Sequence, residues 1–166
     1  PGADERCDNI DNDCDGGTDE NAIDMDTYYQ DADQDGYGET STATDSCTAP
    51  TGFVIDPGDC DDGRSDVNPG ADEKCDGIDN NCDTYIDDDS SIDLSTFYLD
   101  SDGDGYGDPA SSTLSCDAPN NYVADKTDCD DNRFETNPGA DEVCNGLDDD
   151  CSTVPDDNAI DESTWY

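Results

Sequence analysis

A five-residue segment, Pro-Gly-Ala-Asp-Glu, occurs three times in this chain at a nearly constant spacing. It begins at Pro1, Pro69 and Pro138, and cysteines and aspartates recur with it. Such self-similarity indicates a tandem array of small units, each of which contacts mainly its neighbours. We therefore expect a linear tandem array with a first repeat at 1–68, a second at 69–137 and a partial third at 138–166.

Each repeat has too few apolar residues to build a conventional core. The chain has 48 Asp and Glu against 5 Lys and Arg, a net charge of −43, and only 30% of its residues are hydrophobic. Such a composition is typical of disordered chains. Ten cysteines in a small chain indicate instead a disulfide framework of the extracellular kind. We expect metal ions and disulfides to replace the missing core.

The composition also excludes several classes of function. Nucleic-acid binding needs clustered Lys and Arg, and the five present here are scattered. The chain has no apolar run of about 18 residues, so we expect no membrane insertion. Histidine is absent, which removes the commonest general base and the usual imidazole ligand. This excludes serine and cysteine hydrolases that use an imidazole. Because metal spacing explains every carboxylate pair and no unrepeated constellation stands out, we expect a protein that is not an enzyme.

Signals of regular structure are short, so we expect mostly irregular small repeats with short β-strands and single helical turns. Aromatic and β-branched residues predict strands at 27–29, 53–55, 96–99 and 122–123. Asp4 to Ile10 and its copies favour one helical turn. The Ser/Thr-rich stretches 40–48 and 111–115 are expected to be solvated connectors that could carry a glycan. Six aromatic residues are expected to form the small apolar core of each unit, or its contact with the next unit, rather than a sugar-stacking platform; these are Tyr28, Tyr29, Phe97, Tyr98, Trp165 and Tyr166.

The clearest motif is an alternating run of aspartates that ends in glycine. Carboxylates at positions 1, 3 and 5 with glycine at 6 form the first half of a calcium loop, in which positions 7 and 9 add further oxygens. Position 12 is Thr42 or Ser111 where an EF-hand has Glu, so the bidentate ligand must come from elsewhere. The predicted ligands are Asp31, Asp33, Asp35, Tyr37 and Glu39, and in the second copy Asp100, Asp102, Asp104, Tyr106 and Asp108.

A second cluster has the same spacing and surrounds Cys14 and its copies. In the third copy Ser152 replaces the carboxylate at position 5 and the following glycine is lost, which predicts a weaker or remodelled site. The predicted ligands are Asp11, Asp13, Asp15, Asp19 and Glu20, then Asp79, Asn81, Asp83, Asp87 and Asp88, then Asp148, Asp150 and Asp156.

A third cluster is the Asp-Cys-Asp-Asp motif, which is followed by the Glu of the next Pro-Gly-Ala-Asp-Glu segment. We predict that this Glu supplies a bidentate carboxylate, so that the site straddles the repeat boundary. Glu5 would then belong to a site whose other half lies upstream. The predicted ligands are Asp59, Asp61 and Asp62 with Glu73, and Asp128, Asp130 and Asp131 with Glu142.

The cysteines occupy equivalent positions in successive repeats and are expected to form disulfides. Zinc is disfavoured because Cys-x-x-Cys and His are both absent. Pairing of Cys60 with Cys75 and Cys129 with Cys144 is an alternative that leaves Cys7 and Cys151 over. The favoured local pairing is Cys7–Cys14, Cys47–Cys60, Cys75–Cys82, Cys116–Cys129 and Cys144–Cys151.

These motifs together resemble a known family. The segments 68–83, 98–107 and 128–131 are similar to the MopE-type metal-binding repeat of large secreted bacterial proteins, and the likeness covers essentially the whole chain. The Asp-x-Asp-x-Asp-Gly runs are more loosely similar to thrombospondin type 3 calcium repeats. The first resemblance implies a secreted or surface bacterial protein, and its family name implies copper. Because the clusters offer oxygen atoms alone, their chemistry predicts Ca²⁺, several ions per repeat.

Two functions follow from these features. The first is a calcium-binding extracellular structural repeat, whose copies or neighbouring repeats associate end to end in a rigid stalk or surface filament. The alternative is a surface protein that sequesters metal or binds another ligand. Tight binding of a transition metal with little change in folding would favour the alternative.

Overall fold

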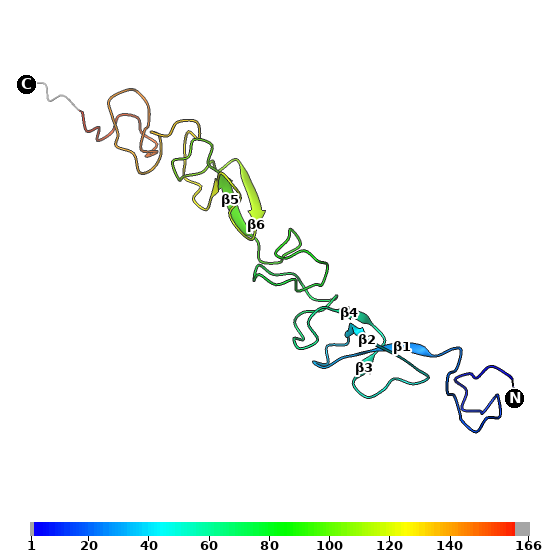
Figure 1. The fold of residues 1–166 in the computed structure, drawn as a ribbon. Coiled ribbons are helices and arrows are strands. Elements are labelled where there is room, and N and C mark those ends of the chain that lie inside the picture. Colours follow the sequence, from blue (N-terminus) through cyan, green and yellow to red (C-terminus); the bar gives the residue numbers. More distant parts are fainter. Residues whose placement is uncertain (1, 162–166) are drawn as a thin grey trace, which may run out of the picture. The chain divides into compact units, whose positions relative to one another are not determined.

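The computed structural model describes residues 2–161. The chain divides into two compact units, one up to Asp87 and one from Asp88 onward. Both consist mainly of turns and bends with short strands (Figure 1). The described residues contain no helix, so the helical turn expected over 4–10 is not present and bends replace it. In residues 2–161, accordingly, no helix has the length and apolar character needed to cross a membrane.

The first unit contains a four-stranded sheet in the order β3-β1-β2-β4. Its strands are β1 (Asp26–Gln30), β2 (Gly38–Ser46), β3 (Phe53–Val54) and β4 (Pro57–Asp59). Strand β1 pairs antiparallel with β2 and β3, whereas β4 pairs in parallel with β2 (Figure 1). The loop between β1 and β2 therefore starts and ends at neighbouring strands.

The second unit contains a three-stranded antiparallel sheet in the order β6-β5-β7. Its strands are β5 (Ser95–Leu99), β6 (Ser112–Ser115) and β7 (Tyr122–Val123). The pairing of β5 with β6 and β7 matches that of β1 with β2 and β3. The sequence repeat is thus also a structural repeat.

The four strands predicted from aromatic and β-branched residues are confirmed as β1, β3, β5 and β7. The prediction that the Ser/Thr-rich stretches are irregular connectors is wrong, because they form most of β2 and all of β6. Thr is β-branched and suits a pleated surface that is half exposed. Tyr28, for example, pairs with Thr44 across the sheet.

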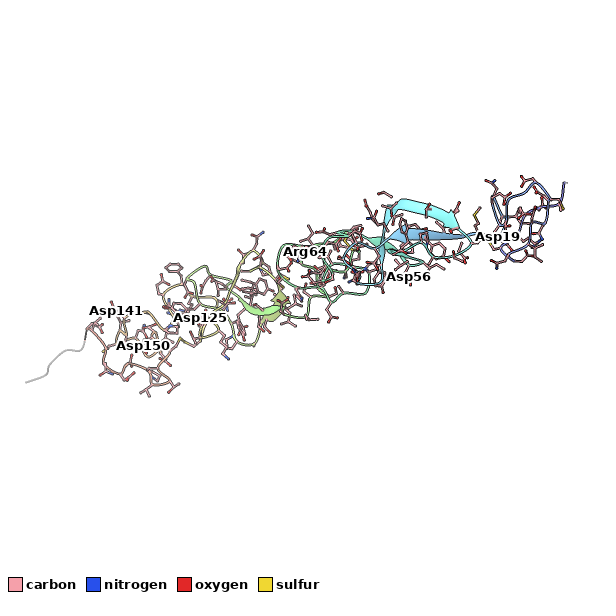
Figure 2. The ribbon with its side chains drawn as sticks, turned by 90° about the horizontal axis from the view of Figure 1, so that it is seen from below. Asp19, Asp56, Arg64, Asp125, Asp141 and Asp150 are labelled. Carbon is pink, nitrogen blue, oxygen red and sulfur yellow. A yellow bond between two sulfur atoms is a disulfide. The ribbon has the colours of Figure 1, made fainter. Side chains whose placement is uncertain are left out.

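The interior of the described residues is largely polar. The buried apolar residues are Ala22, Val67 and Ala159, all small or medium-sized. The aromatic residues at 28–29 and 97–98 are only half-buried, so they do not form the expected core, and Trp165 and Tyr166 lie outside the described residues. Acidic side chains are distributed over both units (Figure 2). The buried polar and charged residues include Glu5, Asp31, Asp59, Glu73, Asn80, Asp100, Asp128, Glu142 and Asp149.

The disulfides differ from both predicted pairings. Bonds join Cys7 to Cys47, Cys60 to Cys82 and Cys129 to Cys151. Cys75 and Cys116 are disulfide-bonded as well, and Cys14 is a free, exposed thiol. The local prediction is wrong because each short cysteine loop is closed by a buried glutamate, described below, and Cys7, Cys82 and Cys151 bond to cysteines of other segments.

Gly38 lies where the loop after β1 returns to the sheet. A Cβ added there would lie 2.6 Å from Tyr29 Cβ and 2.8 Å from the carbonyl oxygens of Tyr29 and Gln30. Backbone atoms cannot move aside cheaply, so only glycine fits. The equivalent Gly107 meets Tyr98 Cβ at 2.7 Å.

Replacing Gly38 should therefore test the packing of this sheet. We expect Gly38→Ala to lower the free energy of unfolding by about 1 to 3 kcal/mol, because the added methyl group forces β1 and β2 apart. Urea denaturation followed by tyrosine fluorescence would measure the loss. Gly63→Ala is the matched control, since its Cβ meets nothing closer than 3.6 Å. Equal effects of the two substitutions would contradict the explanation.

Candidate metal centre

The first candidate site is the loop after β1. Asp31 accepts hydrogen bonds from the backbone N–H groups of Gln34 at 2.7 Å and Gly36 at 3.3 Å. Asp33 and Asp35 each accept one from the backbone N–H two residues ahead, at 3.2 and 2.9 Å. Gly36 has a φ of 103°, which favours glycine. These side-chain turns fold the loop so that its three carboxylates converge.

Two further aspartates reach this loop from β4 and the turn after it. One oxygen atom each of Asp31, Asp33 and Asp62 lie within 4.8 Å of one another, and the same holds for Asp33, Asp35 and Asp59. Asp62 also accepts a hydrogen bond from the loop backbone at 2.7 Å. We call these five residues the first Asp cluster.

Strand β4 is the element that brings the two segments together. It pairs in parallel with β2, with Gly38 opposite Pro57 and Glu39 opposite Asp59. The sequence predicted separate sites for the Asp31 motif and the Asp59 motif, whereas the structure combines them in one cluster. Asp59 and Asp62 thus stand close to the loop that lacks a carboxylate at position 12.

The first Asp cluster contains buried oxygen atoms without hydrogen-bond donors. Asp33 Oδ2 and Asp59 Oδ2 are buried and accept no hydrogen bond from the described residues. Burial, followed by the charges of the neighbouring carboxylates, raises the pKa of both Asp33 and Asp59 above the ordinary aspartate value. Buried like charges with spare lone pairs fit a bound divalent cation, which would supply the missing positive charge.

The second Asp cluster has the same composition in the other unit. It consists of Asp100, Asp102, Asp104, Asp128 and Asp131. Burial and the charges of other cluster members raise the pKa of Asp102 and Asp128. The Oδ2 atoms of Asp102, Asp104 and Asp128 are buried and lack a donor among the described residues. The same arrangement therefore forms twice from separate stretches of sequence.

Each cysteine loop is built around one buried glutamate. Glu73 is only 2% exposed, and its carboxylate accepts backbone hydrogen bonds from Asn80 at 2.9 Å, Asn81 at 3.1 Å and Asp87 at 3.3 Å. Glu142 accepts the equivalent bonds in the third loop. A carboxylate that accepts several N–H groups closes a loop without a disulfide.

These contacts correct the prediction for the third motif. The structure places Glu73 and Glu142 inside the cysteine loops that follow them, where both carboxylate oxygens serve the backbone. Glu5 likewise accepts hydrogen bonds within its own loop, from the backbone of Asn12, Asp13 and Asp19. That Glu5 also belongs to a site with an upstream half stays a prediction. The prediction that Glu73 and Glu142 bind together with the preceding Asp-Cys-Asp-Asp motifs is therefore wrong, because both carboxylates contact the loops that follow them.

The first cysteine loop also contains a carboxylate cluster. Oxygen atoms of Glu5, Asp11 and Asp13 lie within 4.8 Å of one another, and so do those of Asp13, Asp15 and Glu20. The pKa of Asp15 is lowered by a hydrogen bond from the Gly17 backbone and then by Glu20, while the pKa of Glu20 is raised by Asp15. The two carboxylates therefore lie close enough to shift each other's pKa in opposite directions.

The copies of this cluster use their predicted ligands in local turns. Asp79 and Asn81 accept backbone N–H groups of residues 83 and 84, and Asp83 accepts that of residue 85. Asp148 and Asp150 do the same for residues 152 and 153. Ser152, which replaces the position-5 carboxylate, donates to the side chain of Asp157 at 2.8 Å. The turn of the third loop is thus the same as that of the second, and the weaker or remodelled metal site expected there stays a prediction.

Several other predicted ligands lie in different contacts. The carboxylates at position 9 of the second motif accept hydrogen bonds from backbone N–H groups near the start of the same cysteine loop. They belong to Asp19, Asp87 and Asp156. Glu39 accepts from Ser41, Asp88 from Ser90, and Asp108 from Ala110 and Ser111. Asp61 is exposed and Asp130 half-buried, and both donate backbone N–H groups to their Asp clusters.

The two predicted tyrosine ligands contact both their own Asp cluster and a later glycine. The backbone N–H groups of Tyr37 and Tyr106 donate to Asp35 and Asp104. Their hydroxyl groups lie against Gly70 and Gly139. Sequence analysis also missed Asn68, which is 9% exposed and donates to Asp35 Oδ2 at 2.7 Å. Its position before the repeated Pro-Gly segment gave no sequence signal of this contact with residue 35.

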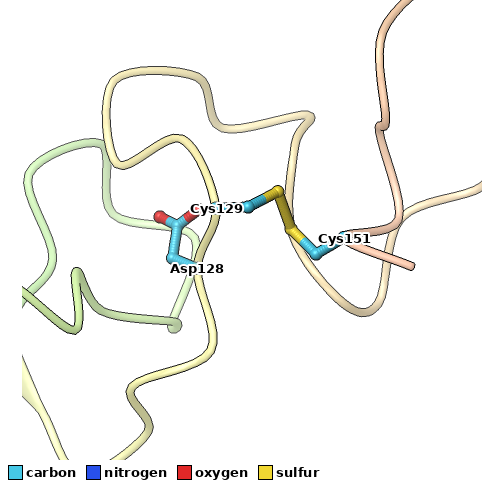
Figure 3. Close-up of side chains that lie close together, drawn as sticks. All are labelled: Asp128, Cys129 and Cys151. Atoms are coloured by element: carbon cyan, nitrogen blue, oxygen red, sulfur yellow. A yellow bond between two sulfur atoms is a disulfide. The ribbon is translucent and has the colours of Figure 1, made fainter. Parts of the chain in front are cut away.

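One acidic group includes sulfur atoms but offers no thiolate. Asp128 lies beside Cys129 and Cys151 (Figure 3). The two sulfur atoms are joined in a disulfide. A disulfide does not supply the thiolate ligand that soft metals prefer. The metal-binding capacity of this part of the chain therefore rests on carboxylate oxygens.

Comparison with known proteins identifies the family. A family model named Cu-binding MopE and described as "Putative metal-binding motif" matches residues 1–20, 59–88 and 128–162, which together exceed half of the chain. The chain belongs to this MopE-type family. The matches cover all three cysteine loops and both Asp-Cys-Asp-Asp motifs, and they support a role in metal binding. No curated protein and no solved structure matches the chain.

The buried glutamate of the MopE-type cysteine loop can be tested directly. We expect Glu73→Ala to lower the free energy of unfolding by about 3 kcal/mol or more, because three backbone N–H groups lose a charged acceptor. The neighbouring Asp72 is exposed, and Asp72→Ala should change stability little. Urea denaturation of both variants gives the comparison. A Glu73→Ala protein as stable as Asp72→Ala would rule out the proposed loop closure.

The raised pKa values predict an unusual pH dependence without metal. The folded protein binds protons at Asp59 and Asp128 more tightly than the unfolded chain does. This stabilisation is complete below the ordinary carboxyl pKa of about 3.9 and is lost as the pH rises through the raised pKa. In a chelator, the urea midpoint should therefore fall as the pH rises above about 4. The double variant Asp59→Asn, Asp128→Asn should flatten this dependence; a midpoint that rises with pH would contradict it.

Proposed function

We propose that this protein is an extracellular calcium-binding structural repeat, in which bound ions hold the loops of each unit together. The observation that carries this proposal is the convergence of the first Asp cluster. Its carboxylates come from two segments, contain buried oxygens without donors, and recur in the second unit. A cation bound there would join the loop after β1 to strand β4.

Calcium suits these clusters better than copper does. Ca²⁺ binds six to eight oxygen atoms in flexible geometry, and aspartate-rich loops with glycine turns are its typical protein ligands. Copper prefers imidazole, thiolate or thioether groups. The chain has no histidine and one methionine. Cys14 is a free thiol, but the two Asp clusters contain no thiol, and Cys7, Cys47, Cys60, Cys82, Cys129 and Cys151 are in disulfides.

A structural role follows from where the clusters lie. Each Asp cluster ties together segments that few apolar contacts hold, since the buried apolar residues are small. An ion at a free concentration one thousand times its Kd stabilises the folded state by about 4 kcal/mol. Extracellular calcium and disulfide formation both suit an extracellular location. Repeats stapled in this way would stack end to end in a stalk or surface filament.

Metal removal and one substitution test the proposal. We expect calcium to raise the urea midpoint and EDTA to lower it, and we expect Asp59→Asn to weaken calcium binding by about tenfold or more at one site. Isothermal titration calorimetry would measure the affinity. Asp56→Asn is the matched control, because this exposed aspartate also lies next to β4. Unchanged stability in EDTA would refute the structural role.

Metal capture is the second candidate function. The Asp13, Asp15 and Glu20 group favours it, because Asp15 is exposed and an ion could enter and leave freely. Titration with Cu²⁺ and Ca²⁺ separates the two functions. Copper bound more tightly than calcium without any change in the urea midpoint would support capture over structure.

A further inference from the structure

The same interface between two kinds of segment occurs twice in this chain. A donor half contains an Asp cluster, its tyrosine and an Asp-Cys-Asp-Asp cysteine, at 31–62 and 100–131. An acceptor half contains the Pro-Gly turn and the cysteine loop that follow, at 69–88 and 138–157. Cys60 joins Cys82 and Cys129 joins Cys151, each with a sequence separation of 22.

A second contact recurs beside each of these disulfides. The hydroxyl oxygen of Tyr37 lies 2.7 Å from where a Cβ on Gly70 would be. The hydroxyl oxygen of Tyr106 lies 2.8 Å from the same point on Gly139. The donor half thus covers the glycine of the acceptor half in both places.

Residues 2–20 form a third acceptor half, in which the cysteine loop has the same local structure while Gly2 has a φ of 96° that neither Gly70 nor Gly139 has. Glu5 is 6% exposed and accepts backbone hydrogen bonds from its loop, as Glu73 and Glu142 do. The φ of Cys14 is 61°, against 59° for Cys82 and 56° for Cys151. The cysteine side chain therefore leaves the loop in the same backbone conformation in all three copies.

The contacts that cover the other two acceptor halves are absent among the described residues around 2–20. Cys14 is a free, exposed thiol, whereas Cys82 and Cys151 are in disulfides. A Cβ on Gly2 would meet nothing within 4 Å, whereas Gly70 and Gly139 are covered by tyrosine. The donor cysteines Cys60 and Cys129 are already bonded to other acceptor halves.

We propose that the surface around Gly2 and Cys14 binds the donor half of a further MopE-type repeat. The tyrosine of its Asp-Gly-Tyr-Gly segment would cover Gly2, and the cysteine of its Asp-Cys-Asp-Asp motif would form a disulfide with Cys14. Two thiols lose two protons and two electrons when this S–S bond forms. A disulfide oxidant such as glutathione disulfide accepts them and leaves as two thiols.

An extended protein tests this proposal. A copy of residues 1–68 is placed before Pro1, with Cys14→Ser in the added copy only, and the protein is refolded with a glutathione redox pair. Iodoacetamide labelling at the original Cys14 is then read by peptide mass. We expect Cys14 to be labelled in the original chain and protected in the extended one, with a mapped disulfide to the Cys60 of the added copy.

A matched control separates docking from the covalent bond. With Cys60→Ser in the added copy, the original Cys14 should be labelled again, but several times more slowly than in the original chain, because the donor half still covers it. Tyr37→Ala in the added copy of this control should restore fast labelling. Full labelling of Cys14 in the extended protein, or a disulfide to any other cysteine, would overturn the proposal. Neither result depends on which metal the protein binds.

Discussion

Hydrogen bonds from backbone N–H groups to carboxylate oxygens organise this chain as apolar burial organises most proteins. Glu73, Glu142 and Glu5 each close a loop in this way, and the aspartates of the Asp clusters shape their own turns by the same contact. A charged acceptor strengthens each hydrogen bond. Because the chain buries few apolar side chains, these bonds make a large contribution to the stability of the fold. The structure therefore depends on where each carboxylate finds its donors.

The same contact creates the electrostatic problem that metal binding would solve. Turn formation uses one oxygen of Asp33 or Asp59 and leaves the other buried with no donor among the described residues. Several such oxygens of like charge meet in one small volume, and water is partly excluded from it. A metal cation would fit these oxygens, in agreement with the metal-binding family to which the chain belongs. The hydrogen bonds that shape each loop thus also leave the carboxylate oxygens that a metal ion could bind.

Sequence periodicity predicted the repeat, four of the strands and the residues of the acidic motifs. It did not predict that Thr40 to Ser46 lie in β2, because polarity indicated a connector while β-branching favoured a strand. The prediction also paired each cysteine with its nearest neighbour in sequence. The short separation gave no sign that the Glu73 carboxylate, and not a disulfide, closes this loop. Both errors arose where a local pattern allowed two outcomes and a distant partner decided between them.

The sequence by itself determined the chemistry: oxygen ligands, the absence of histidine, and a spacing that makes each aspartate run fold on its own backbone. These properties depend on residues only a few positions apart, so they can be recognised without a structure. Only the tertiary structure decided which runs meet. Pairing of β4 with β2 brings Asp59 to Asp33, and the Cys60–Cys82 disulfide joins a donor half to the next acceptor half. Such partners lie many residues apart, and only the folded backbone brings them close together.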